Sequence, residues 1–144
     1  MLFDSVGPFN FPRNRSAGER WRVDFWSEVE ATWEGLSNAI GCYAFGIEYG
    51  SSVKPWYVGM TVAAGGFKAE VFQLHKLEHY DSILDEKKRG TPVIALFPFI
   101  KSESNWDFSK ATVSGKPAIS WLEKTLIAMA HAKNPDFKNS RDTK

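Results

Sequence analysis

The chain has 144 residues, of which 43% are hydrophobic and 24% are charged, and its formal net charge is +1. This composition is that of one ordinary globular domain, and it excludes a disordered polyelectrolyte and a strongly basic histone-like protein. The single cysteine, Cys42, excludes an intramolecular disulfide and a zinc site made of several thiolates. There is no run of about 18 apolar residues and no secretory pattern at the N-terminus, so we expect a cytoplasmic protein without a membrane-spanning segment.

Aromatic and charged residues stand out in the composition. The aromatic content of 15% suits a compact core and also surfaces on which bases stack. Basic residues gather near the start of the chain, at Arg13, Arg15, Arg20 and Arg22, whereas residues 23–53 contain acidic residues and no Lys or Arg. A solvated face is the ordinary explanation of such runs, and a basic patch is the alternative.

The first part of the chain predicts an arm followed by a helix. Residues 1–18 contain Gly7-Pro8 and further turn residues, so we expect an irregular arm anchored by Phe9 and Phe11. Apolar residues then recur at helical spacing and predict a helix from about residue 19 to residue 38. We expect residues 1–40 to pack on a core that residues 41–144 form.

The next part predicts a β-hairpin. Residues 42–49 alternate between two sides, residues 50–52 supply a turn, and residues 56–60 resume as a strand. A long amphipathic helix is predicted over residues 67–88, before Gly90. A third strand follows over residues 92–100, at an edge or a bulge because of Pro98.

The last part predicts a polar loop over residues 101–116 and then a helix. Pro117 suits the first position of that helix, which continues to about residue 132 and ends before Asn134-Pro135. The order of elements predicts an α+β fold with a small antiparallel or mixed sheet.

Glu123 lies within the apolar stripe of this last helix, four residues from both Ile119 and Ile127. A carboxylate on a core-facing stripe is costly unless it is paired, hydrogen-bonded or bound to a metal. One interpretation places Glu123 at the edge of the stripe with its carboxylate in water. The other makes it a metal ligand or a catalytic carboxylate.

Lys68, His75 and His79 form a polar row on the predicted helix 67–88. At helical spacing they lie within about 40° of one another, beside an apolar face made by Phe67, Val71, Leu74 and Leu77. Such a row can face an anion, and a solvated flank is the alternative. Two spaced histidines do not make a metal motif, because a firm site needs more ligands.

Two tripeptides resemble the paired signature of the GIY-YIG nuclease family: Gly41-Cys42-Tyr43 on the first hairpin strand and Tyr57-Val58-Gly59 on the second. A helix after a glycine-containing loop, a third strand and a helix with Glu123 follow in the family's order. Asn134-Pro135 and Asn139 are similar to the family's closing segment. The resemblance covers roughly residues 41–139.

The resemblance implies a three-stranded antiparallel sheet flanked by helices, which hydrolyses nucleic-acid phosphodiester bonds with one divalent ion, Mg²⁺ or Mn²⁺. By position, Glu123 is the metal ligand, Tyr43 takes part in activating the attacking water, and Tyr57 helps to orient the site. Lys68 stands where the family has an arginine that stabilises phosphate charge, and His75 assists proton transfer or contacts the phosphate. A tyrosine with its ordinary pKa of about 10 needs nearby positive charge or metal-bound water to act as a base.

Two departures from the family pattern bear on activity. Lysine in place of arginine removes a planar, bidentate phosphate contact, and the segment between the tyrosines, with residues 50–54 in it, is longer than is usual for the family. We therefore carry two hypotheses: a divalent-metal-dependent endonuclease, and a catalytically degenerate module that binds nucleic acid or a protein partner. Nucleic acid is the expected partner, with DNA favoured over RNA.

Overall fold

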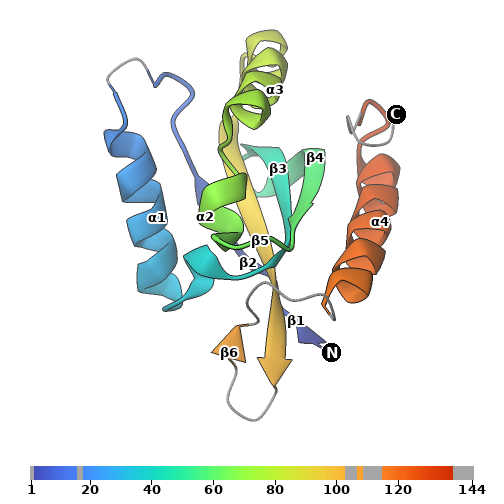
Figure 1. The fold of residues 1–144 in the computed structure, drawn as a ribbon. Helices are drawn as coiled ribbons and strands as arrows, with labels where there is room; N and C mark the ends of the chain where they lie inside the picture. Colours follow the sequence, from blue (N-terminus) through green and yellow to red (C-terminus); the bar gives the residue numbers. More distant parts are fainter. Residues whose placement is uncertain (1, 16–17, 103–106, 109–114, 138–144) are drawn as a thin grey trace.

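The sheet is built around β3 (Gly41–Tyr49), which pairs antiparallel with β4 (Ser52–Thr61) and with β5 (Thr91–Ser102) (Figure 1). The computed structural model describes residues 2–15, 18–102, 107–108 and 115–137. In these residues, β5 also pairs antiparallel with three short strands: β1 (Leu2–Phe3), β2 (Val6–Asn10) and β6 (Asp107–Phe108). The α+β class is confirmed, but the expected sheet of three strands is too small, because other parts of the chain add strands to it.

The predicted hairpin is confirmed, with longer strands than expected. β3 and β4 stay paired from Gly41 and Thr61 to Tyr49 and Ser52, with one irregularity after Phe45. Gly50 closes the turn with a φ of +63°, a conformation that glycine adopts without steric cost. The hairpin therefore holds the two signature tripeptides on adjacent strands.

We expected an irregular N-terminal arm, but this prediction is wrong, because the arm forms β1 and β2, which pair with β5. Of the two alternatives predicted from Pro98, an edge strand or a bulge, the edge strand is wrong, since β5 has β3 on its other side. Pro98 lies where the neighbouring strand changes: Leu96 pairs with β2 and Phe99 with β1. A proline is tolerated there because the hydrogen-bonded pairing of β5 with β2 has ended and that with β1 has not begun, so no backbone N–H is needed at residue 98 on that side.

The helices are α1 (Arg20–Thr32), the short 3₁₀ helix η1 (Leu36–Asn38), α2 (Gly66–Glu70), α3 (Leu74–Glu86) and α4 (Lys116–Lys133). The last helix is confirmed, with Pro117 in its first turn. No helix in the described ranges is long and apolar enough to cross a membrane.

The single helix predicted for residues 67–88 is wrong, because the chain breaks between α2 and α3. Gln73 has a ψ of 153°, which is incompatible with a continuing helix. The Phe72 ring lies 4.9 Å from each of the rings of Trp21 and Phe25, and the Tyr80 hydroxyl donates to the carbonyl oxygen of Val71 at 2.9 Å. Aromatic packing against α1 and this hydrogen bond compensate for the interrupted helix.

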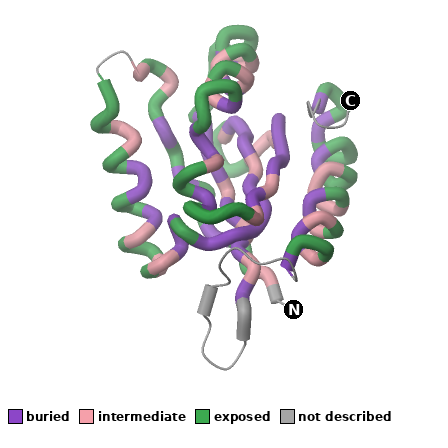
Figure 2. The backbone as a smooth tube through the Cα atoms, viewed as in Figure 1, coloured by how far each residue is buried: buried purple, intermediate pink, exposed green. Residues whose placement is uncertain are grey.

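Helices cover both faces of the sheet. The larger core joins Tyr43 and Phe45 of β3 to apolar residues of α1, α2 and α3. Two smaller clusters join the opposite face, at Cys42 and Val58, to α4. Figure 2 shows the resulting pattern, with the buried side of α4 towards the sheet and its exposed side away from it. The signature strands thus lie between two helical layers.

Candidate functional site

Tyr43 and Tyr57 come together on the face of the sheet that α2 and α3 cover. Tyr43 pairs across the hairpin with Gly59, and Phe45 pairs with Tyr57. The centroids of the two tyrosine rings are 6.2 Å apart, and the exposed fractions of Tyr43 and Tyr57 are 0% and 3%. The structure therefore brings together the tyrosines of the two signature strands and buries both.

Gly59 provides the space for the Tyr43 hydroxyl. A Cβ atom on Gly59 would lie 2.5 Å from Cζ and 2.6 Å from the hydroxyl oxygen of Tyr43. A side chain there would collide with the ring, since protein interiors are already close-packed. The glycine of the second tripeptide thus has a steric role that involves the tyrosine of the first.

Lys76, from the first turn of α3, completes this arrangement. Its Nζ donates a hydrogen bond to the Tyr43 hydroxyl oxygen at 2.7 Å and forms an ion pair with the carboxylate of Glu70. The side-chain exposed fractions of Lys76 and Glu70 are 10% and 24%. We call Tyr43, Tyr57, Glu70 and Lys76 the tyrosine cluster.

The sequence analysis missed Lys76, although one signal was available. Lys76 shares the buried side of α3 with Tyr80 and Leu84 at spacings of four residues, and a charged residue in such a stripe needs a partner. The assumption of one continuous helix concealed this pattern. It placed Leu74 on the apolar face, whereas Leu74 is 73% exposed.

The surroundings of Tyr43 keep it a neutral phenol. Burial raises the pKa of Tyr43 far above its usual range, and Tyr80, Tyr57 and Glu70 raise it further, partly through a side-chain hydrogen bond with Tyr57. Lys76 supplies the positive charge that a catalytic tyrosine needs, but Glu70 is paired with that charge. Tyr43 therefore stays protonated at neutral pH in this arrangement.

The predicted polar row of Lys68, His75 and His79 is not formed on one helix, because Lys68 belongs to α2 and both histidines to α3. The His79 ring lies 5.2 Å from the Tyr57 ring in an edge-on orientation. Burial lowers the pKa of His79, so its imidazole is neutral at pH 7. His75 is exposed in the first turn of α3.

Glu123 belongs to the other side of the sheet. It is 5% exposed, so it lies inside the stripe and not at an exposed edge. Ile119, one turn before it, packs on Cys42, whose thiol donates to the Ile119 carbonyl oxygen at 3.4 Å. Burial, and then the charge of Glu123, raises the pKa of the Cys42 thiol. The structure does not place Glu123 on the face that carries Tyr43 and Tyr57.

The donors around Glu123 decide whether a divalent ion fits there. Mg²⁺ takes oxygen ligands, usually from one or two carboxylates together with waters and substrate phosphates. The charge of Glu123 acts on the buried, protonated thiol of Cys42, and no group of three or more acidic, His or Cys side chains occurs in the described part of the chain. A divalent ion at Glu123 would therefore take most of its ligands from waters and substrate phosphates.

Lys68 is exposed on α2 and lines a separate hollow of about 280 Å³ with side chains of α1 and η1. The carboxylate of Glu30 in this hollow accepts hydrogen bonds from the Ser37 hydroxyl at 2.6 Å and from two backbone N–H groups. Burial raises the pKa of Glu30, but these hydrogen bonds and the charge of Lys68 lower it more. Lys68 therefore faces a carboxylate that stays ionised.

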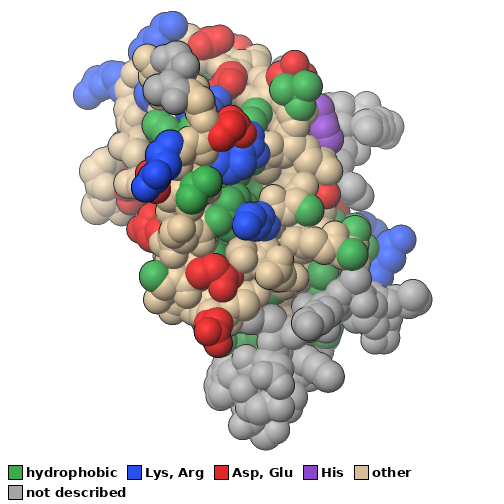
Figure 3. All heavy atoms as spheres, turned by 60° about the vertical axis from the view of Figure 1, so that its left-hand side comes forward, with side chains coloured by type: hydrophobic (Ala, Val, Ile, Leu, Met, Phe, Trp, Pro, Cys, Tyr) green, Lys and Arg blue, Asp and Glu red, His purple; other side chains and the backbone are tan. Residues whose placement is uncertain are grey.

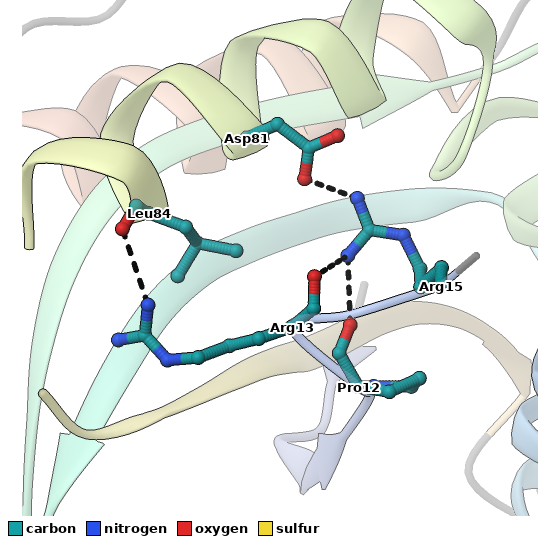
Figure 4. Close-up of polar contacts among 5 residues, drawn as sticks. All are labelled: Pro12, Arg13, Arg15, Asp81 and Leu84. Carbon is teal, nitrogen blue, oxygen red and sulfur yellow. Dashed lines mark hydrogen bonds and ion pairs between the residues drawn. The ribbon is translucent and has the colours of Figure 1, made fainter. Parts of the chain in front are cut away.

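The arginines near the start of the chain are engaged within the fold. Arg13 donates to carbonyl oxygens at the end of α3, and Arg15 pairs with Asp81 (Figure 4). Arg20 and Arg22 pair with carboxylates of their own helix region. Figure 3, which brings the left-hand side of Figure 1 forward, shows basic and acidic side chains interspersed. The basic run is therefore not a free basic patch.

The closing segment fixes the end of α4 to the hairpin. Asn134 is fully buried, and its side-chain amide donates to the Pro55 carbonyl oxygen at 2.7 Å. Asn139, the other residue of that segment, lies outside the described residues.

Comparisons with protein-family models, curated proteins and solved structures found no match for this chain.

Proposed function

We propose that this chain is a nucleic-acid-binding module whose GIY-YIG-like hairpin serves as a scaffold and not as a hydrolytic centre. The enclosure of Tyr43 carries this proposal. Its hydroxyl oxygen accepts a hydrogen bond from Lys76 at 2.7 Å, and the residue has no exposed surface. A general base must reach the proton that it removes, and this hydroxyl faces the core.

The position of Glu123 supports the same proposal. The family resemblance assigns the metal to Glu123, but this residue shares its face of the sheet with Cys42 and apolar side chains. Lys68, assigned to the phosphate, lies in a hollow with Glu30. The adjacent tyrosines favour a fold related to the nucleases, whereas Glu123 and Lys68, to which the resemblance assigns the metal and the phosphate, are not gathered around them.

The test combines a binding and a cleavage measurement on the full chain. Fluorescence anisotropy with labelled single-stranded DNA, duplex DNA and structured RNA should show binding that weakens as salt rises, because phosphate contacts release counterions. Plasmid and the same oligonucleotides should remain uncut with Mg²⁺ or Mn²⁺. A binding signal that is flat with salt, or no binding to any nucleic acid, would contradict a nucleic-acid ligand and favour a protein partner.

Cleavage would overturn the non-catalytic part of the proposal. If the wild type cuts in the presence of a divalent ion and Glu123→Ala does not, the chain is a metal-dependent endonuclease. Tyr43→Phe is the matched variant, since it removes only the hydroxyl that Lys76 contacts. We expect Tyr43→Phe to bind nucleic acid as the wild type does and to unfold more readily.

A further inference from the structure

We propose that the outward face of α4 binds single-stranded nucleic acid, with Trp121 as the platform on which a base stacks. This inference rests on the proposed function, which makes nucleic acid the ligand. Trp121 is 60% exposed, although most of the large aromatic side chains in the described part of the chain are buried or half-buried. Leaving an indole in water is unfavourable, and an exposed aromatic next to basic residues is typical of surfaces that bind single strands.

Trp121 belongs to a continuous apolar strip along α4. At about 100° per residue, Thr125, Ala128 and Ala132 lie within about 40° of Trp121, and Met129 lies about 80° away. Met129 is 62% exposed. The Thr125 hydroxyl donates to the Trp121 carbonyl oxygen at 2.9 Å, so its hydrogen bond is satisfied within the helix. We call these five residues the α4 strip, which follows the exposed side of the helix in Figure 2.

Cations without acidic neighbours accompany the α4 strip. Lys124, three residues from Trp121, and Lys133, four residues from Met129, are exposed neighbours of the strip, and in the described part of the chain neither of them forms an ion pair. Glu123, the single acidic residue in the sequence of α4, is buried. The exposed Asp136 lies after the end of α4. The charge on this face therefore favours a ligand that is negatively charged.

The spacing of Trp121 and Lys124 fits a nucleotide. Residues three apart on a helix are surface neighbours, with Cβ atoms about 5–6 Å apart. A nucleotide carries a flat base and a phosphate on one unit, so successive units can satisfy the indole and the ammonium together. The strand must be single, because the faces of duplex bases are covered by their neighbours.

The groove on the opposite side of the molecule does not combine an exposed aromatic side chain with cations that lack acidic neighbours. The groove of about 620 Å³ between the arm and α3 is lined by Arg13, Arg15 and Arg22 together with four carboxylates. Two of these arginines are held in ion pairs and the third by carbonyl oxygens. A polyanion would meet the carboxylates there, whereas α4 exposes lysines and no carboxylate.

The experiment measures the anisotropy of a labelled oligothymidine of about 15 nucleotides, a length that spans one binding module, with the full chain and its variants. We expect Trp121→Ala to weaken binding by about 10-fold or more, because one stacked base is lost. Lys124→Ala should weaken binding and lower the slope of log affinity against log salt by about 0.7. Binding should also quench tryptophan fluorescence in the wild type, with a loss of that quenching in Trp121→Phe.

Two matched variants serve as controls. Tyr49→Ala removes another exposed aromatic, at the far end of β3, and Lys88→Ala removes an exposed cation after α3. Both should bind as the wild type does. If the wild type binds oligothymidine and Trp121→Ala binds equally well, the inference fails while the proposed function stands. If no nucleic acid binds to the wild type, both fail. Binding of polyglutamate through Trp121, without oligothymidine binding, would overturn the inference in favour of an acidic protein partner.

Discussion

The Nζ of Lys76 lies 2.7 Å from the hydroxyl oxygen of Tyr43, and the same ammonium forms an ion pair with Glu70. One positive charge thus connects α3, β3 and α2 beneath the surface. Such a charge is costly to leave unpaired, although a well-packed apolar replacement for the whole pair costs little. If the tyrosine cluster has a structural role, replacing Lys76 alone should therefore cost more stability than replacing Lys76 and Glu70 together.

Lys76→Met should lower the free energy of unfolding by about 3 kcal/mol, because it leaves the largely buried Glu70 carboxylate without its cation. The double variant Lys76→Met/Glu70→Leu should recover much of that loss. Urea denaturation of both variants, with Lys88→Met as an exposed-lysine control, measures the difference. A double variant no more stable than the single one would contradict the explanation based on an unpaired buried charge.

Gly59→Ala should destabilise the protein by about 1–3 kcal/mol through overpacking. The added Cβ would meet the Tyr43 ring at 2.5 Å, so the ring must move away from Lys76. Combining Gly59→Ala with Tyr43→Leu, which removes the obstructing ring atoms, should make the alanine less harmful than it is alone. Thermal and urea unfolding report the effect. Gly50→Asn is the control, because this position has open space around it and asparagine tolerates a positive φ.

His79 should make the protein less stable as the pH falls. Burial lowers the pKa of His79 in the folded state below the unfolded value of about 6.5. As the pH drops through that unfolded value, the unfolded chain binds a proton that the folded chain does not, so the free energy of unfolding decreases. His79→Gln should therefore flatten the pH dependence between about pH 7.5 and pH 5.5.

Urea midpoints at several pH values compare the wild type with His79→Gln. Parallel curves for the wild type and His79→Gln would show that His79 does not contribute.

Arg13→Ala should release the arm from the end of α3. The guanidinium donates to the carbonyl oxygens of Leu84, Lys87, Arg89 and Gly90 at 2.7–3.1 Å. Figure 4 shows the hydrogen bond to Leu84. Its loss leaves carbonyl groups of the helix terminus without this donor, at a cost of about 2 kcal/mol. Arg13→Lys should restore only part of the stability, since an ammonium lacks the planar fork.

Hydrogen exchange checks this prediction. Amides of β2 and of the last turn of α3 should exchange faster in Arg13→Ala, while those of α4 should not change. Equal acceleration in α4 would indicate general destabilisation and contradict a local role for Arg13.

Local sequence patterns predicted the elements whose signals are complete within a short window. The alternation of residues 42–49, the turn at Gly50 and the start of the last helix at Pro117 are all in the structure. Periodicity also placed Glu123 within the apolar stripe of the last helix, but whether its carboxylate reaches water was decided only by the structure. These features depend on neighbours in sequence, so sequence was sufficient for them.

Contacts between distant segments decided the rest. The arm forms strands because β5 offers it hydrogen-bonding partners that are distant in sequence, such as Ile100 for Leu2, 98 residues away. The break before α3 depends on the packing of Phe72 against α1, and that break turns Lys76 inward and Leu74 outward. Periodicity counted through the break could not place either residue.

The sequence by itself determined that Tyr43 and Tyr57 lie on neighbouring strands and that Glu123 belongs to the apolar stripe of the last helix. Only the tertiary structure decided which face of the sheet each helix covers. α3 brings Lys76 to Tyr43, and α4 carries Glu123 to the side of Cys42. The physical reason is that a strand directs successive side chains to opposite faces of the sheet. Whether a helical residue reaches a given strand residue therefore depends on which face of the sheet the whole helix packs against, and no local sequence pattern encodes that choice.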